Sequence, residues 1–195
     1  MMGQVGTPVV AVESGYVEAL GWNQYGGWRL GIRSFDHKRY YYYAHLRKNY
    51  PYQSGLEVGS VVQAGDVIGY LGRTGYSRTE NTNNIDDPHL HFGLELIFDE
   101  SQKDSNNEIW VSCYELVKFL NLNRCEAVKV EGTKEWKRLY GIKDPLVPVQ
   151  PATPSQAGPA AESQAEPLAK SQAGPQTESQ AGPRTDPQAG SQAES

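Results

Sequence analysis

The feature that most constrains the fold of this chain is a series of short apolar segments, separated by glycine-containing turns, between residues 6 and 96. The segments are rich in valine, isoleucine and aromatic residues, which favour β-strands, while the stretches ESG, NQYGG, QAG and RTG between them favour turns. No amphipathic helical pattern occurs in this region. We therefore predict a mainly β domain built on an antiparallel sheet or barrel-sandwich, with strands at 9–12, 15–20, 28–34, 40–46, 61–62, 67–71 and 89–96.

A helix is predicted only beyond residue 100. Ser112, followed three residues later by Glu115, matches a capping box, and apolar residues follow at helical spacing between 116 and 120. We expect a short helix to begin there and to pack on the sheet, within an extension that covers residues 101–147.

The composition changes at residue 148. From there to residue 195 the chain has no aromatic residue, and the pentapeptide SQAGP recurs in an eight-residue step. Such a segment cannot bury enough apolar surface to offset the entropy of ordering. We predict a domain at residues 1–100, the extension at 101–147 and a disordered repeat tail at 148–195.

Composition excludes several classes of function. The net charge of −5 is small and no basic patch indicates a nucleic-acid partner. No apolar run approaches the roughly eighteen residues that a membrane span needs, and the first residues, MMGQVGTPVVAV, lack the pattern of a secretory signal. Cys113 and Cys125 have no zinc-binding spacing, so they are buried thiols or, in an exported protein, one disulfide.

Three of the four histidines are placed to form a polar site. His89 and His91 stand two apart in DDPHLHFGLEL, so on a strand both imidazoles share the face opposite its leucines and phenylalanine. His45, in RYYYYAHLRK, is expected to share a face with Tyr41 and Tyr43. One such histidine would be an ordinary core residue, but three on neighbouring strands indicate a common site. The fourth, His37, lies in a predicted turn.

The order of motifs in this chain resembles a known family. The motifs are GTPVVAVESGYVEAL, a glycine-rich hairpin, YYYYAHL, LEVGSVVQAGDVIGYLGRTGYS and PHLHFGLEL. Together, over residues 5–96, they resemble the lysostaphin and LytM type of zinc metalloendopeptidase, metallopeptidase family twenty-three. The resemblance implies a largely antiparallel β fold, an extracytoplasmic or cell-wall location, and cleavage of peptidoglycan peptides or glycine-rich cross-links.

The resemblance also implies roles for the three histidines. In the family, the second histidine of His-x-His is a zinc ligand, which corresponds to His91. His89 and His45 correspond to residues beside the metal that orient or deprotonate water and stabilise the oxyanion. Tyr41, Tyr43 and Tyr76 are candidates to line a substrate groove, although tyrosine is also an ordinary strand residue.

The chain departs from the family pattern ahead of its first strand. The family takes its other two zinc ligands from a His-x-x-x-Asp motif shortly before Gly-Thr-Pro-Val, and here MMGQV contains neither residue. A catalytic zinc needs about three protein ligands, so we expect the chain as written to retain zinc poorly and to hydrolyse little. Either the chain begins too late, after the ligand motif, or it is a metal-free module that binds cell-wall peptides or a partner enzyme.

Two further segments of the sequence suggest a carrier-domain motif and a polar loop. VGSVVQAGDVIG also resembles half of a biotinyl or lipoyl carrier domain, but Lys38, the lysine in a turn, lacks the flanking residues of such a carrier. The polar segment 77–87, SRTENTNNIDD, is expected to form a loop at the edge of the groove that limits which substrates enter.

Overall fold

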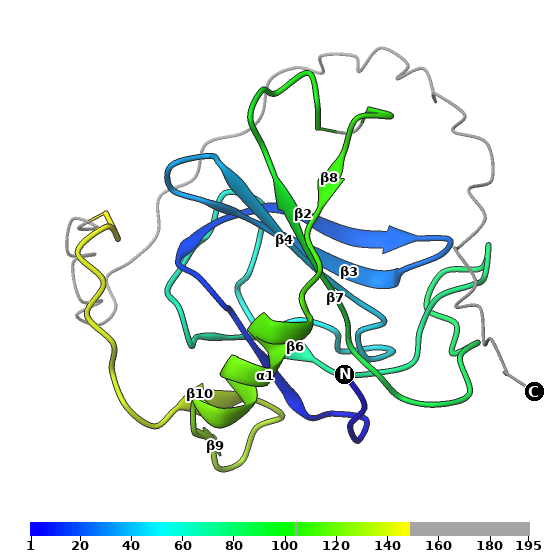
Figure 1. The fold of residues 1–195 in the computed structure, drawn as a ribbon. Helices are drawn as coiled ribbons and strands as arrows, with labels where there is room; N and C mark the ends of the chain where they lie inside the picture. Colours follow the sequence, from blue (N-terminus) through cyan, green and yellow to red (C-terminus); the bar gives the residue numbers. More distant parts are fainter. Residues whose placement is uncertain (104, 149–195) are drawn as a thin grey trace, which may run out of the picture. The chain divides into compact units, whose positions relative to one another are not determined.

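The structure, a computed structural model, describes residues 1–103 and 105–148. Its main element is an antiparallel sheet of six strands in the order β5-β2-β3-β4-β7-β8 (Figure 1). The predicted mainly β, antiparallel fold is confirmed, while the predicted repeat tail lies outside the described residues from 149 onward. The six strands are β2 (Gly15–Asn23), β3 (Gly27–Ser34), β4 (Arg39–Ala44), β5 (Val61–Val62), β7 (His91–Leu96) and β8 (Ile109–Trp110).

Two smaller antiparallel sheets complete the described part of the chain. Strand β1 (Pro8–Val10) pairs with β6 (Val67–Tyr70), and β9 (Ala127–Lys129) pairs with β10 (Trp136–Arg138). Turn glycines between strands, which the sequence predicts, allow the chain to reverse within a few residues. The result is a set of short strands that reverse direction repeatedly.

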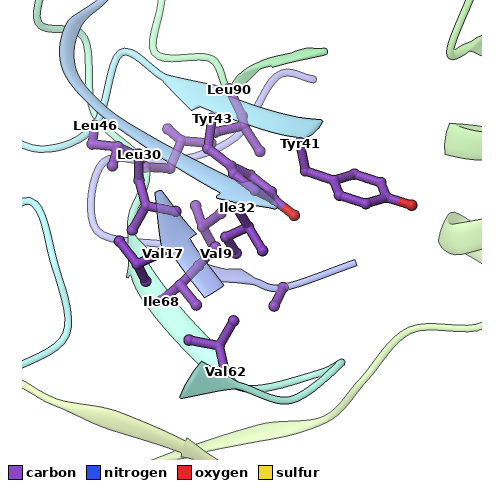
Figure 2. Close-up of a cluster of buried hydrophobic side chains, with 12 residues drawn as sticks. Val9, Val17, Leu30, Ile32, Tyr41, Tyr43, Leu46, Val62, Ile68 and Leu90 are labelled. Carbon is purple, nitrogen blue, oxygen red and sulfur yellow. The ribbon is translucent and has the colours of Figure 1, made fainter. Parts of the chain in front are cut away.

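The hydrophobic core lies between one face of the six-stranded sheet and the β1–β6 pair. Leu30 and Ile32 of β3 stand opposite Tyr43 and Tyr41 of β4, so all four side chains point the same way. Val9 and other side chains of the small sheet pack against them (Figure 2). Because alternate residues point to opposite faces, the other face of the large sheet is available to carry polar residues.

The helix α1 (Tyr114–Leu122) follows the last strand of the large sheet, but it does not begin as predicted. Its N-cap is Cys113, which makes no side-chain capping hydrogen bond, so the predicted capping box from Ser112 is wrong. None of its residues is buried, and Phe119 is exposed. The helix therefore contributes nothing to the core cluster.

Neither a disulfide nor a membrane-spanning helix is found among the described residues. Cys113 and Cys125 are free thiols, each half-buried. Within residues 1–103 and 105–148, no helix is long and apolar enough to cross a membrane.

Candidate functional site

The structure brings the three predicted site histidines together. The ring centre of His45 lies 4.9 Å from that of His89 and 5.6 Å from that of His91. His91 begins β7 and pairs with Ala44, the last residue of β4, while His89 pairs with Met2 in an isolated bridge. His37 does not join this group: it is exposed and stacks on Tyr16.

His45 reaches this site through a local break in the strand. Strand β4 ends at Ala44, and His45 has a φ of 61°, a left-handed conformation that is uncommon for residues other than glycine. Its backbone N–H donates to the carbonyl oxygen of Gly26 at 2.8 Å. The break interrupts the alternation of faces, so Leu46 points into the core while His45 turns toward the other histidines.

The prediction that Tyr41 and Tyr43 line a groove is wrong. They are only 5% and 1% exposed and belong to the hydrophobic core. The Tyr43 hydroxyl accepts a hydrogen bond from the backbone N–H of Val12, and the Tyr41 hydroxyl donates to Glu13. The expected shared face with His45 required uninterrupted alternation, which the left-handed residue abolishes.

Different aromatic residues stand beside the histidines. The ring of Tyr42, on the face opposite Tyr43, lies 5.8 Å from His91 and 6.2 Å from Trp110. Tyr76 is 52% exposed and stacks on His45 at 5.9 Å. Its role in a groove stays a prediction. Tyr42 was not predicted to lie at this site, because strict alternation of faces along the strand placed it on the face away from His45.

The RTG turn, residues 73–75, packs against His45 and forms a hydrogen bond with its side chain. The Nδ1 atom of His45 lies 2.8 Å from the carbonyl oxygen of Thr74. Gly75, with a φ of 124°, comes so close that a Cβ there would lie 3.0 Å from the same Nδ1 atom. Only glycine fits this backbone position without strain.

Hydrogen bonds determine which nitrogen of two imidazoles carries a proton. A carbonyl oxygen only accepts, so His45 donates from Nδ1 to Thr74, and His89 donates from Nδ1 to the carbonyl of Asp87 at 2.8 Å. In the neutral rings Nε2 is then unprotonated. Each of these two atoms can accept a proton from water or from a reacting group, which is the chemistry of a general base.

Burial keeps His45 neutral. Desolvation is the main cause that lowers the pKa of His45 from 6.5 to about 4, and His89 and His91 act in the same direction, whereas the Thr74 hydrogen bond opposes them. At neutral pH the His45 imidazole is therefore uncharged and available to take up a proton.

This pKa predicts how stability depends on pH in the metal-free chain. Between pH 6.5 and about 4 the unfolded chain protonates His45 and the folded chain does not, so the free energy of unfolding falls as the pH is lowered, by up to about 3 kcal/mol. We expect His45→Gln to lack this component in urea titrations at pH 7, 5.5 and 4. Parallel pH profiles for the two proteins would contradict it.

The polar segment 77–87 is tied to the domain beside this site. The Asn81 side-chain oxygen accepts hydrogen bonds from the Trp28 indole at 2.9 Å and from the backbone N–H of Asn49 at 2.8 Å. Further along, Asn84 donates to the carbonyl oxygen of Tyr76 at 2.8 Å. The loop is thus anchored at two points, while its effect on substrate choice stays a prediction.

The histidines do not by themselves fit a zinc centre. Among the described residues, no group of three or more histidine, cysteine, aspartate or glutamate side chains is arranged to hold a metal ion. His45 and His89 each present one unprotonated nitrogen, but a catalytic zinc needs about three protein ligands in a tetrahedral arrangement. The described residues therefore supply only part of such a site.

Comparison with known proteins shows similarity over the β domain. An L-Ala--D-Glu endopeptidase of Bacillus subtilis (strain 168) is 40% identical over 89 residues, which are 46% of this chain and 26% of that protein. Lysostaphin of Staphylococcus simulans is 39% identical over 89 residues, which are 45% of this chain and 15% of that protein. The match thus spans about a quarter of the length of the first relative and less of the second.

A solved structure and a family model agree with this similarity. The crystal structure of a putative glycyl-glycine endopeptidase lytM from Ruminococcus gnavus ATCC 29149 is 37% identical, with a TM-score of 0.50, and the match covers 60% of this chain and 42% of that one. The model of Peptidase family M23 matches residues 1–105, more than half of the 195 residues. The chain therefore belongs to peptidase family M23.

Proposed function

We propose that this protein is a peptidoglycan endopeptidase that acts outside the cytoplasm on the peptides of the cell wall. The observation that best supports the proposal is the convergence of His45, His89 and His91 in a chain of family M23. The names of its relatives, an L-Ala--D-Glu endopeptidase and a lysostaphin, support a cell-wall peptide as the substrate.

In this proposal the three histidines have different roles: two transfer protons and one binds zinc. His45 and His89 each offer an unprotonated Nε2, so they take up the proton of an attacking water and, once protonated, donate to the developing oxyanion or to the leaving amine. His91, which is exposed beside them, is assigned as the chain's zinc ligand. Since the described residues do not complete a three-ligand site, we expect weak retention of zinc by the chain as given.

One observation favours a second candidate function. The incomplete ligand set among the described residues is also what a metal-free module would have. Such a module would hold cell-wall peptides, or a partner enzyme, on the same sheet face without cutting them.

Zinc content separates the two candidates. We expect the 195-residue chain to carry well below one zinc per molecule by inductively coupled plasma mass spectrometry. A variant with an added segment bearing His-x-x-x-Asp ahead of Met1 should approach one zinc per molecule and release new amino groups from purified peptidoglycan. The matched control has alanine at both added ligand positions, and His91→Ala in the extended chain should lower zinc content as well.

Two other outcomes of this experiment would contradict the endopeptidase proposal. If the extended chain folds and binds peptidoglycan peptides but takes up no zinc, the module that binds without cutting is the correct reading. If it binds no peptidoglycan peptide and cuts none, both candidates fail.

A further inference from the structure

We infer that Arg29 recognises a free carboxylate on the peptide substrate beside the histidines, an inference that rests on the proposed function. Arg29 directly precedes Leu30, which pairs with Tyr43 and lies in the core. Because strand residues alternate between faces, Arg29 lies on the opposite face of the sheet. That face also carries Tyr42, Ala44 and His91.

The register of the strands places Arg29 in line with the site. Continuing the β3–β4 pairing by one residue from Leu30 and Tyr43 puts Arg29 beside Ala44, and Ala44 pairs with His91. Arg29 and His91 are therefore separated by the single strand β4, roughly 10 Å from backbone to backbone. A peptide that lies across this row can contact the guanidinium and the imidazoles together.

Arg29 has no carboxylate partner within the described residues. No ion pair and no side-chain hydrogen bond joins its guanidinium to another residue in residues 1–103 and 105–148, although it is half-buried. By contrast, Arg33, on the same face four residues further along, is held by both Glu18 and Glu100. On this sheet face, therefore, Arg33 is paired with carboxylates, whereas Arg29, in line with His91, has no such partner among the described residues.

The surroundings of Arg29 agree with this placement. Its charge acts on the hydroxyls of Tyr42 and Tyr52, where it partly offsets the rise in pKa that burial causes. Glu80 also acts on Tyr52, but no ion pair joins it to Arg29 in the described part of the chain. The guanidinium is therefore close enough to the Tyr42 hydroxyl for its charge to act there, and the Tyr42 ring in turn lies beside His91.

The chemistry of the guanidinium selects the class of substrate. Its planar donors match a carboxylate in a two-pronged hydrogen bond, which is stronger than a neutral one. Stem peptides of peptidoglycan contain a side-chain-linked glutamate whose α-carboxylate is free unless it is amidated, and glycine bridges contain no carboxylate within the chain. Arg29 therefore favours acidic stem peptides over glycine bridges.

Binding measurements on three peptides test the inference without requiring hydrolysis. The peptides are a stem peptide with a free glutamyl α-carboxylate, the same peptide amidated, and pentaglycine, each titrated by calorimetry into the full chain. We expect the acidic peptide to bind about tenfold more tightly than the amidated one. Arg29→Gln should remove that preference, lowering the affinity for the acidic peptide more than that for the amidated one, and Arg29→Lys should keep part of it.

The control and the outcomes keep the two proposals apart. Arg124→Gln removes an exposed arginine in the segment after α1 and should leave the preference intact; matched thermal unfolding of all variants shows that they fold. Equal binding of acidic and amidated peptides by wild type, unchanged in Arg29→Gln, overturns the role of Arg29 but not the proposed function. Failure of wild type to bind any of the three peptides overturns the proposed function itself.

Discussion

Replacing Gly75 with alanine is expected to destabilise the protein by about 3 kcal/mol or more, as overpacking and left-handed strain add, and to displace His45. At a φ of 124°, the new Cβ would lie 2.3 Å from the carbonyl oxygen of Tyr25, 3.0 Å from Nδ1 of His45 and 3.1 Å from the backbone nitrogen of Gly27. Two of these atoms are backbone, and the segment after Gly75 bonds back to the β2–β3 turn. Relief therefore requires the turn and the imidazole to separate.

A matched glycine separates the clash from the conformational strain. Gly55 also has a positive φ, of 80°, but no atom lies within 4 Å of the position of its Cβ. Gly55→Ala should cost about 1 kcal/mol from the left-handed conformation alone. Urea unfolding gives both values, and the ¹H–¹⁵N spectrum of the imidazoles reports the position of His45. Equal losses for the two variants would show that Gly75 is not packed against the site.

Replacing Leu30 with alanine is expected to lower the free energy of unfolding by about 3 kcal/mol, within the usual range for a buried leucine. Leu30 is fully buried, belongs to the core cluster and stands opposite Tyr43 (Figure 2). Its loss leaves a cavity between the large sheet and the β1–β6 pair, which partial relaxation cannot fill.

The same substitution at an exposed leucine is the control. Leu122, at the end of α1, is 84% exposed, so Leu122→Ala should change stability by less than about 0.5 kcal/mol. Both variants are compared by chemical denaturation followed through tryptophan fluorescence. If Leu30→Ala unfolds at the same urea concentration as Leu122→Ala, the placement of Leu30 in the core is wrong.

Much of the fold could be predicted because it depends on local patterns. Short apolar segments and glycine turns predicted the antiparallel sheet, and strands β1 to β7 fall within or beside the expected ranges, whereas β8, β9 and β10 were not predicted. The helix was expected, but its start was not, because the N-cap is Cys113, which makes no side-chain capping hydrogen bond, and not the predicted Ser112. Where a helix begins depends on the direction from which the chain enters it as well as on the capping residues. The sequence does not show that direction.

The histidine site shows both the reach and the limit of such patterns. The spacing of His89 and His91, together with the family resemblance, singled out three imidazoles, and in the structure the ring of His45 lies within 5.6 Å of each of the other two, centre to centre. Tyr41 and Tyr43 were assigned wrongly to the face of His45, because a single left-handed residue at 45 interrupts the alternation of faces. That conformation is supported by Gly26 and Thr74, which come from other turns of the chain.

The sequence by itself determined that this chain forms an antiparallel sheet and that three of its histidines are candidates for one site, because period-two hydrophobicity, turn residues and motif spacing are written in neighbouring positions. Only the tertiary structure decided that Tyr43 is core while Tyr42 stands beside His91, that burial makes His45 a weak base, and that no carboxylate among the described residues pairs with Arg29. Those properties depend on contacts between residues far apart in the chain, which set backbone strain, desolvation and ion pairing.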